Sequence, residues 1–109
     1  MIDWERVKEL RGEIGADDFA EVVEMFLQEA DEAVTRLSPA LTAKAMEADL
    51  HFLKGAALNL GFVALSGLCQ DGERRAAGGS TEVDLDSVAQ VYRASKTAFQ
   101  TGLERALAA

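Results

Sequence analysis

Apolar residues recur at steps of three and four along most of the chain, which is the spacing of amphipathic helices. The clearest stripe lies between residues 46 and 60 and consists of Met46, Leu50, Leu53, Ala57 and Leu60. No stretch shows the alternation of apolar and polar residues that is typical of a half-buried strand. The pattern therefore predicts an all-α fold.

Capping residues and glycines indicate where the helices begin and end. Asp3 can cap a short first helix, and the segment 12–15, Gly-Glu-Ile-Gly, is expected to end it. Ser38-Pro39 has the form of a helix start, and Gly61 has the form of a helix end. The helices expected on these signals run over about 4–10, 17–37, from between 39 and 43 to 60, 62–77, and from 84 or 86 almost to the end.

Four long amphipathic helices with short connections predict an antiparallel four-helix bundle, with the short first helix as an N-terminal addition. The 109 residues, 49% of them hydrophobic, suffice for one real core and are too few for two. We find no internal repeat and no second composition regime. We therefore expect a single domain over residues 1–109.

Charge and cysteine usage narrow the classes of function. A net charge of −8 disfavours a general nucleic-acid or anionic-membrane binder, so a protein partner or small solute is expected. The one cysteine, Cys69, cannot form an internal disulfide and is expected to be a buried apolar residue. The start of the chain has no signal-peptide pattern, and the uncharged stretch 55–70 is too short for a membrane span. These features favour a monomer in the reducing cytoplasm.

The inventory of residues argues against several enzymatic chemistries. One histidine and one cysteine cannot supply the roughly four ligands of a structural zinc site. A di-iron bundle needs Glu-x-x-His motifs, whereas Ala48 stands three residues before the histidine. The glycine-containing run 55–61 is not followed by Gly-Lys-Ser or Gly-Lys-Thr, so it does not match an ATP-binding loop. We expect no metal, no cofactor and no autonomous kinase activity.

The histidine itself, His51, lies about 140° around the helix from the centre of the apolar stripe and should therefore face solvent. Lys54 and Gly55 follow at the +3 and +4 positions, which makes them its neighbours on the next turn. An exposed imidazole can act as a nucleophile towards phosphoryl groups, and a nearby ammonium can stabilise the charge on the transferring group. This face is the candidate site.

Three further residues suggest that a partner docks on this face. Gly55 costs the helix about 1 kcal/mol relative to alanine, so it leaves a gap for which close approach of a partner is one reason. Phe52 and Leu58 lie outside the core stripe and offer apolar surface beside the histidine. Singly, a surface histidine, a solvated lysine and a helical glycine are ordinary features. Their combination at neighbouring positions favours a functional surface.

The run from His51 to Gly61, HFLKGAALNLG, resembles the signature of histidine-containing phosphotransfer (HPt) domains, and the resemblance extends over nearly the whole chain. The resemblance implies that His51 is phosphorylated and carries the phosphoryl group between aspartates of response-regulator receiver domains, or from a sensor or hybrid histidine kinase to such a domain. Magnesium would belong to the receiver. Ala56 and Ala57 stand where many members have serines, which leaves the nucleophile untouched.

The segment 68–73 is similar to the phosphoacceptor domains of chemotaxis kinases, in which a glutamate hydrogen-bonds the phosphoacceptor histidine. The resemblance assigns that role to Glu73. A carboxylate that accepts from one ring nitrogen would fix the tautomer and leave the other nitrogen free to attack. Those domains also carry a second histidine where this chain has Gln70, which weakens the chemotaxis interpretation.

The sequence thus favours a phosphohistidine carrier without turnover of its own. The start at Met1 favours a free-standing protein, and the first alternative is a phosphoacceptor domain cut from a hybrid or chemotaxis-type kinase. A second alternative is a helical adaptor or dimerisation module that binds through Phe52 and Leu58 without phosphorylation. An enzyme with its own active site ranks last, because one histidine makes no cluster of titratable groups.

Overall fold

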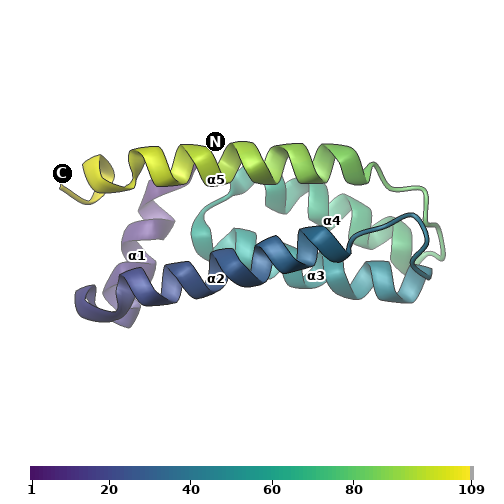
Figure 1. The fold of residues 1–109 in the computed structure, drawn as a ribbon, viewed down its shortest axis with the longest axis horizontal. Coiled ribbons are helices and arrows are strands. Elements are labelled where there is room, and N and C mark those ends of the chain that lie inside the picture. Colours follow the sequence, from purple (N-terminus) through teal and green to yellow (C-terminus); the bar gives the residue numbers. More distant parts are fainter. Residues whose placement is uncertain (109) are drawn as a thin grey trace.

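A computed structural model describes residues 1–108 of the chain, and within them it has five helices and no strand. Helices α2 to α5 form an elongated bundle, and α1 crosses one end of it between the first turns of α2 and the last turns of α5 (Figure 1). The expected all-α bundle with an extra N-terminal helix is confirmed. The helices are α1 (Trp4–Ile14), α2 (Ala16–Arg36), α3 (Ala43–Leu60), α4 (Val63–Ala77) and α5 (Leu85–Ala108).

Side-chain caps and one left-handed glycine fix the ends of α3, the helix that bears the histidine. The Thr42 hydroxyl accepts a hydrogen bond from the Ala45 amide at 3.1 Å, which satisfies one of the free amides of the first turn. Gly61 ends the helix at φ 74°, in the left-handed conformation that glycine adopts without strain. The expected end at Gly61 is confirmed, and the start at Ala43 lies within the expected range of 39 to 43, although the cap is Thr42 instead of Ser38.

The first helix is longer than expected. It continues through Gly12 to Ile14, and Gly15 at φ 101° ends it, so that α2 begins at Ala16 instead of Asp17. A single helical glycine costs only about 1 kcal/mol, and one further turn brings Ile14 into contact with the core. Packing therefore outweighs the local preference.

The core contains all five residues of the apolar stripe of α3, each with at most 1% of its surface exposed. Around them lies a group of aromatic rings: Phe62, Phe99 and Tyr92 are buried, and Trp4 stacks on Phe99 with ring centroids 5.8 Å apart. The expected burial of Cys69 is also confirmed, because none of its surface is exposed. One side of α3 is therefore buried in the core, and its other side faces outward.

Polar contacts join α2 to its neighbours on both sides. Asp31 of α2 accepts a hydrogen bond from the Tyr92 hydroxyl and pairs with the Lys96 ammonium of α5 at 2.9 Å. On the other flank of α2, Arg36 pairs with Asp49 of α3 at 3.2 Å. These contacts fix the rotation of α2, because they lie on opposite edges of the helix.

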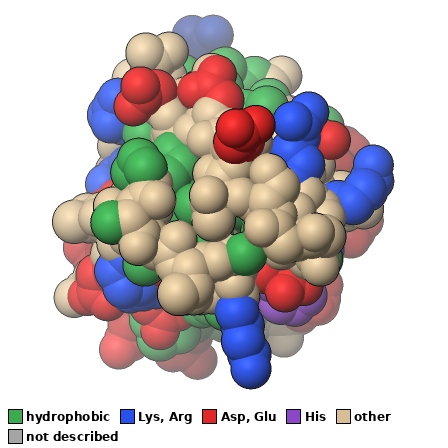
Figure 2. All heavy atoms as spheres, turned by 90° about the vertical axis from the view of Figure 1, so that its right-hand side faces the viewer, with side chains coloured by type: hydrophobic (Ala, Val, Ile, Leu, Met, Phe, Trp, Pro, Cys, Tyr) green, Lys and Arg blue, Asp and Glu red, His purple; other side chains and the backbone are tan. Residues whose placement is uncertain are grey.

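The surface at the loop end of the bundle carries acidic and basic side chains interspersed around its rim (Figure 2).

None of the helices in residues 1–108 combines the length and the apolar character needed to cross a membrane.

Candidate functional site

His51 lies on the outward side of α3, as the periodicity predicts. Its chain neighbours Leu50 and Leu53 are fully buried, which fixes the rotation of the helix and turns residue 51 to the surface. The imidazole is 68% exposed, and histidine atoms are visible at the surface in Figure 2 beside acidic atoms. A partner can therefore reach the ring without any rearrangement of the backbone.

Glu73 of α4 lies beside the imidazole. Its Oε1 atom is 2.7 Å from Nδ1 of His51, although the two residues are 22 positions apart in the chain. The glutamate side chain is only 18% exposed, so most of it is covered where α4 packs against α3. The structure thus brings together the two residues that the resemblance had paired.

Gly72 allows α4 to lie close enough to α3 for this contact. A Cβ atom at position 72 would stand 3.0 Å from both Leu50 Cδ1 and Val83 Cγ1, which is tighter than normal packing. A larger residue would therefore force these two side chains or α4 itself to shift, and a shift of α4 would move Glu73 relative to His51. The sequence placed Gly72 on the inner side of α4 and gave no signal for this role.

Lys54 also contacts Glu73. Its Nζ atom is 2.8 Å from Oε2, and the lysine side chain is only 21% exposed. The prediction that Lys54 lies one turn from His51 is confirmed. The prediction that its side chain is exposed is wrong. The ammonium folds over the helix surface to Glu73 because Oε2 is shut off from solvent and needs a charged partner.

The pKa of Glu73 is lowered from its ordinary value, chiefly by the contact with the Lys54 ammonium and further by the hydrogen bond to His51, which together outweigh the effect of burial. The carboxyl group is therefore ionised at neutral pH, and an ionised carboxylate can only accept hydrogen bonds. Nδ1 of His51 must then carry the proton. In the neutral ring this leaves the lone pair on Nε2, which has no hydrogen-bond partner among residues 1–108.

Cys69 lies on the inner side of α4, one turn before Glu73. Burial raises the pKa of its thiol to about 12, with a further contribution from the Glu73 charge. A thiol with so high a pKa is not a nucleophile at neutral pH. Cys69 is therefore part of the core beneath the site.

The three residues expected to receive a partner all lie on the outward side of α3. A Cβ atom at Gly55 would have no atom within 4 Å, so this position is open. Phe52 is 40% and Leu58 is 56% exposed. Sequence reasoning missed Val63, the first residue of α4, which is also 56% exposed and lies close to Leu58 across the α3–α4 turn.

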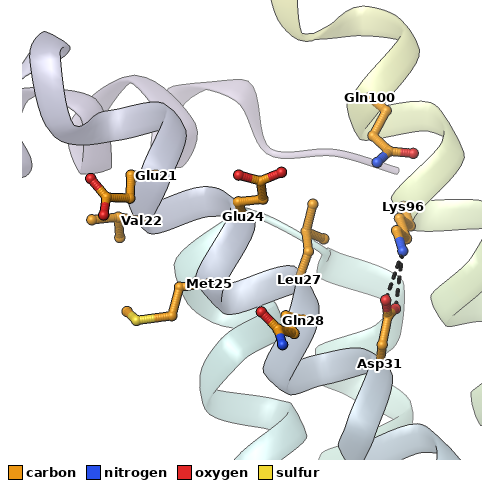
Figure 3. Close-up of a pocket in the computed structure, with 9 residues that line it drawn as sticks. All are labelled: Glu21, Val22, Glu24, Met25, Leu27, Gln28, Asp31, Lys96 and Gln100. Atoms are coloured by element: carbon orange, nitrogen blue, oxygen red, sulfur yellow. Dashed lines mark hydrogen bonds and ion pairs between the residues drawn. The ribbon is translucent and has the colours of Figure 1, made fainter.

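A hollow of about 700 Å³ lies on a different face of the molecule, between α2 and α5 (Figure 3). The Asp31–Lys96 pair crosses one side of it, and Met25 points away from that pair. Its lining residues come from α2 and α5 alone, whereas His51, Lys54 and Glu73 belong to α3 and α4. The hollow is therefore separate from the candidate site. Within residues 1–108, no group of three or more His, Cys, Asp and Glu side chains is arranged to hold a metal ion.

In a comparison with protein families, residues 21–109 match the Hpt domain. The matched region covers most of the chain, begins within α2 and contains His51, Lys54 and Glu73. Searches of curated proteins and of solved structures returned no match. Hpt domains act in the phosphotransfer of two-component signalling and are phosphocarriers rather than enzymes. With a helical bundle, an outward histidine and a family match over more than half its length, the chain belongs to the Hpt domain family.

Proposed function

We propose that His51 is the residue that is phosphorylated, and that the chain carries the phosphoryl group between aspartates of response-regulator receiver domains. The observation that carries the proposal is the contact of Glu73 with Nδ1, which leaves the other nitrogen of a 68% exposed ring free to react. The phosphoryl group can come from a receiver of a hybrid kinase or from a sensor kinase. Another receiver accepts it.

The transfer step uses the lone pair of Nε2. Nε2 attacks the phosphorus of an aspartyl phosphate, the Nε2–P bond forms, and the bond between phosphorus and the aspartate oxygen breaks, so that the aspartate leaves as a carboxylate. The ring then carries a proton on Nδ1 and a phosphoryl group on Nε2, and its positive charge faces the ionised Glu73. The reverse step returns the neutral ring, and no proton has to move in either direction.

Lys54 supports this step in two ways. Its contact with Oε2 of Glu73 holds the carboxylate so that Oε1 meets Nδ1. An ammonium has three donors, and one contact with Glu73 leaves others for an oxygen of the phosphoryl group. Because the transferring group is negatively charged, a cation within one helical turn lowers the cost of bringing it to the ring.

The chain needs no cofactor for these steps, because the histidine is the nucleophile and the aspartyl phosphate supplies the reactive phosphoryl group. The magnesium ion on which such transfer depends is expected on the receiver domain and not on this chain. Phe52, Gly55 and Leu58 are proposed as the surface on which the receiver rests.

The test is incubation of the chain with a phosphorylated receiver domain, followed by detection of phosphate that is stable in alkali and labile in acid. We expect the chain to be labelled and His51→Gln to remain unlabelled with an unchanged helical circular dichroism spectrum, because residue 51 is exposed. Full labelling of His51→Gln would refute the assignment. A pure adaptor would bind the receiver and take up no phosphate.

A further inference from the structure

The corner where α3 turns into α4 has a hollow with an apolar rim. Leu58 and Val63, each 56% exposed, stand on its two sides, and the buried ring of Phe62 forms part of its lining. Its volume is about 240 Å³. A cavity of about 150 Å³ is enough for a benzene ring, so this hollow has room for one large apolar side chain.

The hollow has little to offer a charged ligand. Asp3 is the one charged residue in its lining, and the Oδ1 atom of Asp3 accepts a hydrogen bond from the Arg6 amide at 3.2 Å, where it caps α1. The Ser66 hydroxyl donates to the Val63 carbonyl oxygen at 3.0 Å. One oxygen of the Asp3 carboxylate and the Ser66 hydroxyl are thus engaged within the chain, and the exposed side chains of Leu58 and Val63 give the hollow its apolar rim.

The backbone around the hollow is tied in place. The Asp3 amide donates to the Gly61 carbonyl oxygen at 2.8 Å, and Ile2 pairs with Phe62 in an isolated antiparallel bridge. A Cβ atom at Gly61 would lie within 2.5 Å of the Asp3 carbonyl oxygen, so the N-terminal segment rests directly on the turn. The hollow is therefore preformed, and filling it requires no ordering of the backbone.

The hollow lies within reach of a protein that is centred on His51. Leu58 follows the histidine by two helical turns, which is about 10 Å along α3. A standard interface buries about 800 Å² on each partner, which corresponds to a patch of about 16 Å radius. A receiver domain seated on the histidine therefore covers the corner. A second copy of this chain is a poorer occupant, because each copy carries a net charge of −8.

We infer that the α3–α4 corner is a specificity pocket, which receives one apolar side chain of the receiver domain while the receiver's aspartate meets His51. This inference rests on the proposed function. It adds which feature of the receiver is recognised, an apolar side chain, and which residues of this chain recognise it. Because the pocket acts on docking, receivers with an apolar side chain at the facing position are favoured over receivers with a charged one.

The experiment compares two phosphodonors. The first is the phosphorylated receiver domain that exchanges with this chain fastest, and the second is phosphoramidate, a small donor that needs no docking surface. Three variants test the pocket: Leu58→Ser and Val63→Ser remove its apolar rim, and Ser66→Leu fills it. Met25→Ser is the matched control, because Met25 is 49% exposed and lies on α2.

For each of the three variants we expect the receiver concentration at half-maximal rate to rise about tenfold, which is the usual effect of losing one well-packed apolar contact. The maximal rate should stay the same, because the groups around Nε2 are unchanged. Labelling by phosphoramidate and the behaviour of Met25→Ser should match the unmodified chain.

The outcomes separate the two proposals. If neither the phosphorylated receiver nor phosphoramidate labels His51, the proposed function is wrong. If His51 is labelled but all three variants exchange with the receiver like the unmodified chain, the pocket inference is overturned. If the unmodified chain is a dimer that Leu58→Ser or Val63→Ser converts to a monomer, the corner is a self-association surface, and the inference is likewise overturned.

Discussion

The Glu73 carboxylate of α4 contacts two residues of α3 at once. One of its oxygens lies 2.7 Å from Nδ1 of His51, and the other lies 2.8 Å from Nζ of Lys54. The histidine is 68% exposed while the glutamate is 18% exposed. The reactive ring is therefore open to a partner, and the group that sets its tautomer is sheltered from solvent and held by a second charge.

Replacing Glu73 should slow phosphoryl transfer to a degree that depends on the replacement. In Glu73→Ala the ring loses its acceptor, and we expect single-turnover transfer to fall about tenfold, the effect of one partly exposed charge-assisted hydrogen bond. In Glu73→Gln the amide oxygen can still accept from Nδ1, so the loss should be smaller. The ¹⁵N chemical shifts of the His51 ring report the tautomer directly. An unchanged tautomer in Glu73→Ala would contradict the positioning role.

Removing the Lys54 ammonium should raise the pH at which the Glu73 carboxylate protonates. The pKa of Glu73 is lowered chiefly by Lys54, so in Lys54→Ala it should return towards its ordinary value of 4.5. The carboxylate then protonates at a higher pH than in the unmodified chain, and the pH dependence of the Glu73 side-chain ¹³C chemical shift measures this change. The maximal rate should also drop, because a cation near the phosphoryl group is lost.

Lys44→Ala is the control for this experiment, because Lys44 is exposed and lies in the first turn of α3. In this control the titration of Glu73 and the maximal rate should be unchanged. An unshifted titration of Glu73 in Lys54→Ala would mean that the lysine does not act through Glu73.

The contact between α2 and α5 should make stability depend on pH in acid. Burial raises the pKa of Asp31, but the hydrogen bond from Tyr92 and the Lys96 charge outweigh it, so that the pKa is lowered from 3.8. A lowered pKa stabilises the fold above the ordinary value and loses that contribution as the pH falls through the lower native pKa. Chemical unfolding at pH 7 and at pH 2–3 measures the difference.

Tyr92→Phe should cost about 1 kcal/mol at pH 7, because it removes a hydrogen bond to a partly exposed carboxylate. This cost should become smaller as the pH falls through the lowered pKa of Asp31, because a protonated carboxyl group is a weaker acceptor. A cost that is equal at the two pH values would assign the effect to the other acceptor of the Tyr92 hydroxyl, the Leu27 carbonyl oxygen at 3.2 Å.

Ser95 offers a test of an unpaired buried group. It is fully buried in α5, and its hydroxyl oxygen has no hydrogen-bond partner among residues 1–108. Ser95→Ala removes the desolvated hydroxyl and introduces a better helix former, so we expect the free energy of unfolding to rise by about 1 kcal/mol. Ser87→Ala should act in the opposite direction, because the Ser87 hydroxyl donates to Asp84 at 2.7 Å. Destabilisation by Ser95→Ala would show that the hydroxyl is satisfied.

The position of His51 could be predicted from the sequence because it depends on local periodicity. Five apolar residues fix which side of α3 is inward, and the histidine follows from them. The end of α3 could be predicted for the same reason, because it depends on one glycine, Gly61. The contact of Glu73 with His51 depends on how closely α4 packs, which is set by Gly72 against Leu50, and no pattern within one helix reveals it. Only the family resemblance pointed to Glu73.

The conformation of Lys54 could not be predicted for a related reason. The side chain has several rotatable bonds, and its direction is decided by an acceptor on another helix. Val63 was missed because it lies at the start of α4, where periodicity says little about exposure. The segment 12–15 was correctly predicted to end α1, because Gly15 caps it, but the helix continues beyond the expected residue 10 to Ile14, which packs against the core.

Substitutions at Gly55 should change the stability of the fold and the rate of phosphoryl transfer in opposite directions. A Cβ atom there meets nothing within 4 Å, so Gly55→Ala should stabilise α3 by up to about 1 kcal/mol through the lower backbone entropy of the unfolded chain. Gly55→Leu should also fold, because its side chain extends into solvent. Transfer from a phosphorylated receiver should nevertheless fall in Gly55→Leu, since the added bulk stands one turn from His51 and a displacement of about 1 Å can cost about 100-fold in rate. Labelling by phosphoramidate should be unaffected, which separates docking from chemistry. If Gly55→Leu exchanges with its receiver as fast as the unmodified chain, the receiver does not rest on this turn, and if it unfolds, residue 55 does not face solvent.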